Sequence, residues 1–159
     1  GAVALQAAVA HPARVSALNL IAPAGLGAEI NAEYINGFIA ADSRKLMKPL
    51  LQQLVADPSL VNRSLVDDML QFKRTDGVPE ALRIIADGFV AGDGQCFNLR
   101  DSLSGLSQPV TVIWGSEDNI IPASHANGLP DTVKVEVLPG YGHLVQLEAA
   151  AEVNVLLGA

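Results

Sequence analysis

In this 159-residue sequence, two acidic residues and one histidine lie at positions where they could transfer a proton. Glu117 and Asp118 lie in the turn 115-GSEDNIIP-122, and His143 lies in 139-PGYGHLVQLE-148. A carboxylate that accepts a hydrogen bond from one imidazole nitrogen fixes the tautomer, so the other nitrogen can take a proton from a nucleophile. We therefore predict a general base at His143, oriented by one of the two carboxylates.

Asp118 is the preferred carboxylate, because the shorter side chain sits where the loop must bend back, and Glu117 is the alternative. Each candidate also has a purely structural explanation. An aspartate commonly caps a turn through its own backbone, and a lone histidine more often satisfies a backbone group. Gly140 and Gly142 favour the catalytic interpretation of the histidine, because glycine allows positive φ and close backbone approach around the ring.

The other titratable candidates are weaker. His11 precedes Pro12 at the end of an apolar helix, where it can serve the last carbonyl groups. His125 lies in a polar turn between strands, and neither histidine has a matching carboxylate loop. The single cysteine, Cys96, excludes an internal disulfide and a zinc cluster of several thiolates, and we expect it to be a half-buried residue. We predict no metal and no organic cofactor in this chain.

The elements that must position Asp118 and His143 alternate between helix and strand. Apolar spacing predicts a fully buried helix over residues 1–11 and short strands over 15–21, 110–114 and 133–138. Ligands bind at the carboxyl ends of strands in open α/β sheets, and short crossovers make successive strands neighbours. Two loops at one sheet edge can therefore bring a carboxylate to an imidazole. The last segment is helical by spacing, with Leu144, Leu147 and Ala151 on one face.

Residues 26–106 have a different pattern, with apolar positions three or four apart between Asp-Pro, Asp-Gly and Gly-Asp turns. We predict that this segment is an all-helical cap inserted into an α/β core formed by residues 1–25 and 107–159. Its larger apolar side chains are expected to pack in its own core: Phe38, Met47, Met69, Phe72 and Phe89.

Composition excludes several classes of partner. Ten basic and seventeen acidic residues give a net charge of -7, which disfavours nucleic acid and anionic lipid surfaces. No apolar run approaches the roughly 18 residues that cross a bilayer. We expect a cytoplasmic protein with no membrane and no nucleic-acid partner.

The motifs around the two candidate residues resemble the C-terminal part of α/β-hydrolases. That family places its acid in a loop of the form W-G-x-x-D-x-x-x-P, and this chain has 114-WGSEDNIIP-122. It places its histidine in a Gly-His pair before the last helix, and this chain has 140-GYGHLVQLE-148. The stretch 11-HPARVSALNLIAPAG-25 is similar to the segment that follows the nucleophile helix. The resemblance implies three parallel strands flanked by helices, with Asp118 and His143 as members of a Ser-His-Asp triad.

The cap segment beginning APAGLGAEINAEYINGF resembles, more narrowly, the hydrolase-like domain of the acyltransferase component of bacterial acetoin dehydrogenase complexes. This resemblance implies a parent polypeptide with an acetyl-transfer role. It also implies a lipoyl group on an upstream domain absent from these residues.

One family feature is missing, because the chain contains no G-x-S-x-G elbow, in which the nucleophilic serine lies on a strand-to-helix turn. The resemblance places that serine upstream of Gly1, so we expect the chain to be a fragment that is inactive alone. Ser102, Ser104, Ser107, Ser116 and Ser124 have cap or turn positions instead. We also expect an unpaired edge on strand 15–21, which would bind the missing half or a second copy.

Three functions remain open at this stage. The parent protein could be a serine hydrolase or acyltransferase acting on a small acyl, ester or ketone compound. It could also be a carbon-carbon bond hydrolase or lactonase of the same fold. The third alternative is a non-catalytic scaffold domain of a multienzyme complex, in which the histidine and aspartate are vestigial.

Overall fold

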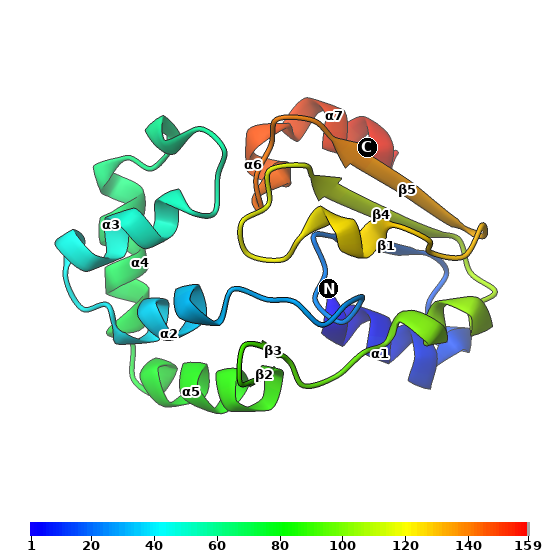
Figure 1. The fold of residues 1–159 in the computed structure, drawn as a ribbon, viewed down its shortest axis with the longest axis horizontal. Helices are drawn as coiled ribbons and strands as arrows, with labels where there is room; N and C mark the ends of the chain where they lie inside the picture. The colour runs from blue at the N-terminus through cyan, green and yellow to red at the C-terminus, as the bar shows by residue number, and fades with distance from the viewer. Residues whose placement is uncertain (159) are drawn as a thin grey trace.

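The computed structural model describes residues 1–158 and has a three-stranded parallel sheet at its centre (Figure 1). The strand order is β1 (Leu18–Ile21), β4 (Val110–Gly115) and β5 (Val133–Leu138). In the pairing of β1 with β4, Leu18 lies opposite Val110. In the pairing of β4 with β5, Gly115 lies opposite Leu138. The three predicted parallel strands are confirmed, although the first begins three residues late because Pro12–Arg14 form the 3-10 helix η1.

Helices cover both faces of this sheet. Helix α1 (Ala2–Ala10) and the 3-10 helix η3 (Arg100–Gly105) pack on the face that carries Val112 and Trp114. Helices α6 (Val145–Glu148) and α7 (Ala150–Leu157) pack on the face that carries Ile113 (Figure 1). Successive residues of β4 point to opposite faces of the sheet. Because helices cover both faces, both sets of side chains are apolar.

Two predicted helix faces differ from the structure. Helix α1 is not buried all round, because Leu5 faces the sheet while Val3 is exposed. In the last segment the buried residues are Val145, Ala149 and Val153, spaced four apart, so the predicted face is wrong. Leu147 and Ala151, two of its members, are exposed. The segment breaks between α6 and α7, which a single helical spacing does not anticipate.

The predicted cap contains helices α2 (Ala32–Ala40), α3 (Arg44–Gln52), α4 (Arg63–Lys73) and α5 (Val78–Phe89), and the 3-10 helix η2 (Pro58–Leu60). They lie to one side of the sheet (Figure 1). It is not all helical, because β2 (Val90–Ala91) and β3 (Gly94–Gln95) form a hairpin. Gly92, with a φ of +61°, makes that reversal accessible.

Asparagine side chains cap the amino ends of two helices in the cap, α2 and α4. Asn31 accepts a hydrogen bond from a backbone amide in the first turn of α2, and Asn62 does the same for α4. The Lys73 ammonium donates to the carbonyls of Phe38 and Ala41 at the end of α2, which fastens α4 to α2.

The cap has a buried cluster of its own around Met47, Leu51 and Val66, whereas Leu26 and Leu103 pack with the sheet. The expectation for Phe72 is wrong, because that ring is exposed. The other expected members are half-buried or buried: Phe38, Met47, Met69 and Phe89.

Two further findings concern Cys96 and the membrane. Cys96 is exposed rather than half-buried. Within residues 1–158, no helix is long and apolar enough to cross a bilayer.

Candidate active site

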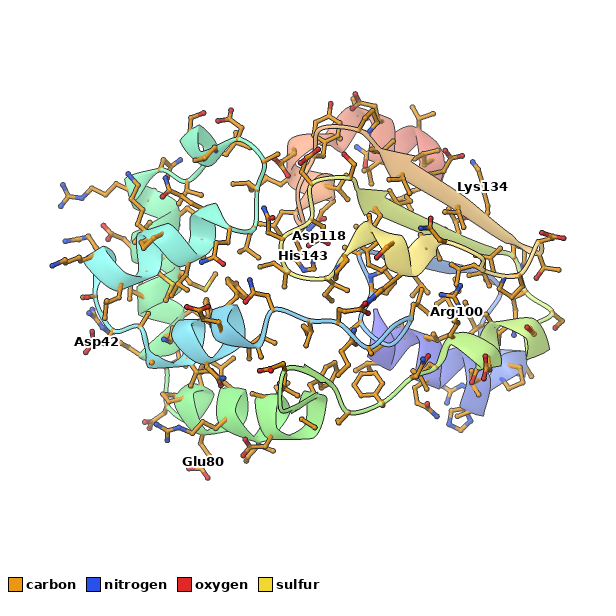
Figure 2. All side chains as sticks on the ribbon, viewed as in Figure 1. Asp42, Glu80, Arg100, Asp118, Lys134 and His143 are labelled. Carbon is orange, nitrogen blue, oxygen red and sulfur yellow. The ribbon has the colours of Figure 1, made fainter. Side chains whose placement is uncertain are left out.

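Asp118 and His143 lie side by side at the carboxyl edge of the sheet, between the sheet and the cap helices (Figure 2). They follow β4 and β5, which are adjacent parallel strands. His143 Nδ1 lies 2.8 Å from Asp118 Oδ2. The loops therefore bring together the two residues singled out from the sequence, in a hydrogen-bonded pair that can position an imidazole for proton transfer.

Backbone and side-chain donors hold the carboxylate of Asp118 in one orientation. Its Oδ1 accepts from the amides of Ile120 and Ile121 at 2.8 and 3.0 Å, and its Oδ2 also accepts from Trp114 Nε1 at 2.9 Å. The Asp118 side chain is 0% exposed. It thus caps its own turn and also contacts the histidine, so the structural and catalytic interpretations of this residue are compatible.

The alternative carboxylate points elsewhere. Glu117 is exposed, and its carboxylate lies 3.4 Å from Ser116 Oγ. Its backbone amide donates to the carbonyl of Tyr141 at 2.8 Å, so Glu117 contributes to the site through its main chain.

Two glycines allow the acid loop, residues 115–122, and the histidine loop, residues 139–144, to touch. A Cβ on Gly115 would lie 2.2 Å from the carbonyl oxygen of Gly142, so no larger residue fits there without a shift. Gly140 has a φ of +79°, and its amide donates to Ser116 Oγ at 2.8 Å. This close contact sets the histidine loop against Asp118.

The other side of the histidine loop contacts the cap. The amide of Leu144 donates to the carbonyl of Leu54 at 2.9 Å. Glu148 accepts from the amide of Gly142 at 2.6 Å and from that of Ala56 at 2.7 Å. Sequence reasoning missed the role of Glu148, since no spacing rule relates it to a segment about ninety residues earlier.

The far nitrogen of His143 is available for chemistry. The side chain is 22% exposed, and the hydrogen bond recorded for the ring within residues 1–158 is the one at Nδ1. With Nδ1 donating to Asp118, Nε2 is the nitrogen that can accept a proton.

A second histidine-carboxylate pair corrects the prediction for His125. Its Nε2 lies 2.7 Å from Glu29 Oε2, although the sequence showed no carboxylate partner. The His125 side chain is 4% exposed, in the 3-10 helix η4 (Ala123–Ala126), and within residues 1–158 its Nδ1 is buried without a hydrogen bond. A hydrogen bond from His125 lowers the pKa of Glu29. Gly27 is required beside the ring, because a Cβ there would lie 2.3 Å from it.

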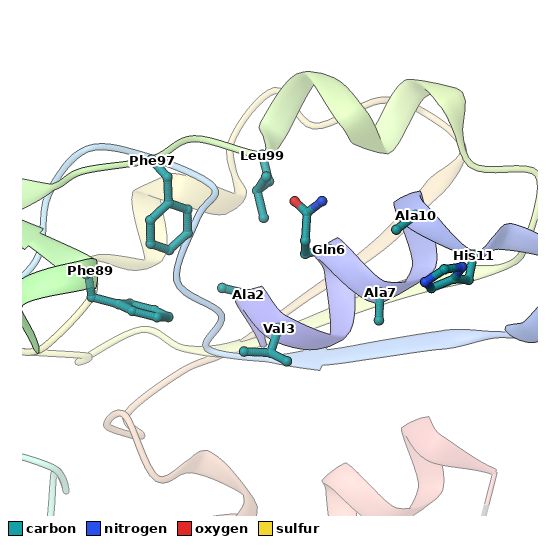
Figure 3. A pocket seen from close by; sticks show the side chains of 10 residues that line it. Ala2, Val3, Gln6, Ala7, Ala10, His11, Phe89, Phe97 and Leu99 are labelled. Atoms are coloured by element: carbon teal, nitrogen blue, oxygen red, sulfur yellow. The ribbon is translucent and has the colours of Figure 1, made fainter. Parts of the chain in front are cut away.

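A separate apolar cavity of about 500 Å³ lies away from Asp118 and His143, against the outer side of α1 (Figure 3). Val3, Ala7 and His11 line it from the helix, and Phe89 and Phe97 close the other side. His11 ends α1 with an exposed side chain, and its backbone amide donates to the carbonyl of Ala7. None of the residues that line this cavity is acidic, so within residues 1–158 the cavity offers His11 no carboxylate partner.

Comparison with known proteins identifies the fold. The family model described as alpha/beta hydrolase fold matches residues 1–150. The chain belongs to the α/β-hydrolase fold family. A meta-cleavage product hydrolase from Pseudomonas fluorescens IP01 has the same fold, with a TM-score of 0.81 and 23% identity. The match covers 97% of this chain and 58% of that hydrolase.

Two relatives have a higher sequence identity to this chain than that hydrolase has. The dihydrolipoyllysine-residue acetyltransferase component of the acetoin cleaving system of Pseudomonas putida is 51% identical over 154 residues. The component of the same name from Cupriavidus necator is 41% identical over 157 residues. The matches cover 97% and 99% of this chain but only 41% and 42% of those relatives. The chain thus spans less than half their length, and its predicted resemblance to such components is confirmed.

Proposed function

We propose that this α/β-hydrolase chain forms part of the acetyltransferase component of an acetoin-cleaving system, and that Asp118 and His143 are the acid and base of a Ser-His-Asp triad. The carrying observation is the buried Asp118 carboxylate, fixed by three other donors and 2.8 Å from Nδ1 of a partly exposed imidazole. The 51% identity to the Pseudomonas putida component supports the assignment to this system. In the whole protein, a lipoyl group on a separate domain is the acyl carrier that fits this role.

The proposed nucleophile lies outside these 159 residues. Ser102, Ser104 and Ser107 precede β4 and therefore lie toward the amino edge of the sheet, away from His143. Ser116 Oγ accepts from the Gly140 amide. Gly1 starts α1 against Pro23, where a Cβ would lie 2.5 Å from the proline, just after β1 at the carboxyl edge. A residue preceding Gly1 would reach the same edge as His143.

The chemistry follows from this arrangement. The serine hydroxyl attacks the carbonyl carbon of an ester or thioester while His143 Nε2 takes its proton. Asp118 stabilises the resulting imidazolium, which then protonates the leaving alcohol or thiol. The acyl group passes to water or to an acceptor in a second round. A carbon-carbon bond hydrolase or lactonase would use the same pair, and the resemblance to a meta-cleavage product hydrolase keeps the former as the second candidate.

Labelling by a fluorophosphonate probe tests the triad. The full-length protein should form one adduct on the elbow serine, and the 159-residue chain should form none. His143→Ala in the full-length protein should slow labelling by at least about 10³-fold, because members of a triad act as a unit. An adduct on the short chain would place the nucleophile among its own serines. No labelling of the full-length protein would favour the scaffold alternative.

A partner for β1 is also part of the proposal. Within residues 1–158, β1 pairs with β4 on one side and is an edge strand on the other. An apolar edge strand recruits another strand, so the isolated chain should self-associate or bind the preceding part of the protein. Light scattering combined with hydrogen exchange checks this. A monomer at all concentrations with rapid exchange along β1 would count against it.

A further inference from the structure

Glu148 connects the cap to the histidine loop through three backbone amides. Its Oε2 accepts from Gly142 at 2.6 Å, and its Oε1 accepts from Ala56 at 2.7 Å and from Asp57 at 3.3 Å. The salt bridges recorded within residues 1–158 do not include Glu148, so backbone groups are its partners. Charge-assisted hydrogen bonds of this kind are stronger than neutral ones.

Both chain neighbours of His143 are attached to residues 54–57, the segment that joins α3 to η2. Gly142, before the histidine, is held through Glu148. Leu144, after the histidine, donates directly to the carbonyl of Leu54. A movement of the 54–57 segment is therefore transmitted to the backbone on both sides of His143.

The backbone of Gly142 lies so close to residues 55 and 56 that no side chain fits between them. A Cβ on Gly142 would lie 2.8 Å from the amide nitrogen of Ala56 and from the Cα of Val55. Val55 is itself buried. The two backbones consequently meet directly, and the Glu148 carboxylate satisfies amides on both.

The Gly142 bond alone would be an ordinary helix cap, since an acidic side chain in the first turn often reaches back to an amide before the helix. The bonds to Ala56 and Asp57 go further, because these residues are not part of α6 or of its entry loop. A cap for the helix does not require donors from another region of the molecule.

We propose that Glu148 is a positioning residue that couples the placement of the cap to the orientation of His143. It does not touch the reacting atoms. It holds the histidine loop so that Nδ1 meets Asp118 and Nε2 faces the substrate space only while the 54–57 segment is in place. This inference rests on the proposed function.

Nuclear magnetic resonance of the full-length protein tests the coupling without any activity. In Glu148→Gln the amide group keeps one acceptor oxygen and cannot serve both segments. Hydrogen exchange of the Gly142 and Ala56 amides should accelerate together, by about tenfold or more, and the His143 ring should lose its single tautomer. Glu152→Gln removes the same charge one turn later, where the carboxylate accepts a long, 3.4 Å hydrogen bond from the Tyr141 hydroxyl, and should change neither.

Glu148→Asp is the second variant, because it keeps the carboxylate but shortens its reach. It should restore part of the amide protection and part of the His143 tautomer signal. Faster exchange at Gly142 alone, with Ala56 and the His143 ring unchanged, would mean that Glu148 is only a helix cap, and the coupling would be wrong.

Labelling of the full-length protein separates this inference from the proposed function. Glu148→Gln should slow fluorophosphonate labelling by about 10–100-fold, since small misplacements of a catalytic group have effects of this size. If His143→Ala abolishes labelling while Glu148→Gln leaves it unchanged, the coupling fails and the triad stands. If His143→Ala has no effect, the triad fails.

Discussion

In one histidine-carboxylate pair of this molecule the carboxylate is buried, and in the other the histidine is buried. Asp118 is fully enclosed beside His143, which is 22% exposed. His125 is enclosed, and Glu29 beside it is 70% exposed. The distances are nearly equal, at 2.8 and 2.7 Å. Distance alone therefore does not distinguish the pair proposed as catalytic from the other one.

The difference lies in what remains available at the second ring nitrogen. His143 Nε2 is on an accessible ring and can exchange a proton, whereas His125 Nδ1 is buried without a partner among the residues that the structure describes. Trp114 lies between the two pairs, with its Nε1 on Asp118 and its ring edge-on to His125 at 6.1 Å. Trp114 therefore contacts one member of each pair.

The largest expected loss of stability comes from removing the buried carboxylate of Asp118. Asp118→Ala leaves the buried amides of Ile120 and Ile121 without their acceptor, and Trp114 Nε1 keeps only its bond to the carbonyl of Ile121. The free energy of unfolding should therefore fall by about 4 kcal/mol. Trp114 is the single tryptophan of the sequence, and its fluorescence during urea denaturation measures the change. The exposed neighbour provides the control, because Glu117→Ala should stay within about 0.5 kcal/mol. Equal losses for the two variants would contradict the assignment of Asp118.

The two histidines should differ in the same assay. His125→Ala removes a buried ring that packs against Trp114, and should lower the free energy of unfolding by about 3 kcal/mol. His143→Ala removes a partly exposed ring and should lower it by about 1 kcal/mol or less. A reversed order would mean that His143 is the structural histidine.

The smallest expected effect is on the pH dependence of stability, through the exposed carboxylate of Glu29. The hydrogen bond from His125 holds the pKa of Glu29 below its ordinary value of 4.5. Because the folded pKa is depressed, the stabilisation is present above about pH 4.5 and is lost as the pH falls through the folded pKa. Glu29→Gln should therefore flatten the acid side of a plot of unfolding midpoint against pH, by a small amount because the group is exposed.

The control for this measurement is Glu33→Gln, which removes an exposed carboxylate from the first turn of α2. That variant should keep the wild-type shape below pH 4.5. An acid limb that is identical in the wild type and in Glu29→Gln would show that the pair contributes nothing in solution.

The sequence predicted the parts of the fold that depend on local pattern. Apolar runs located β4 and β5, and the loops that follow them located Asp118 and His143, because parallel strands deliver their carboxyl ends to one edge. The partner of His125 could not be predicted in this way. Glu29 comes from the loop before α2, and only the packing of that loop over η4 brings the side chains together.

The incorrect helix faces have a related cause. Spacing within a helix identifies an apolar face, but the break between α6 and α7 decides that Val145, Ala149 and Val153 face the sheet. The hairpin formed by β2 and β3 is only two residues long on each side, which is too short for alternation to be recognised.

The measurement that most directly tests the central claim is the ¹⁵N spectrum of the imidazole nitrogens at a pH where the three histidines are neutral. Single histidine variants provide the assignments. We expect His143 to carry its proton on Nδ1, with Nε2 free as an acceptor, and His125 to carry its proton on Nε2 toward Glu29. A His143 ring protonated on Nε2, or averaging between the two tautomers, would contradict the role of Asp118 as its orienting carboxylate.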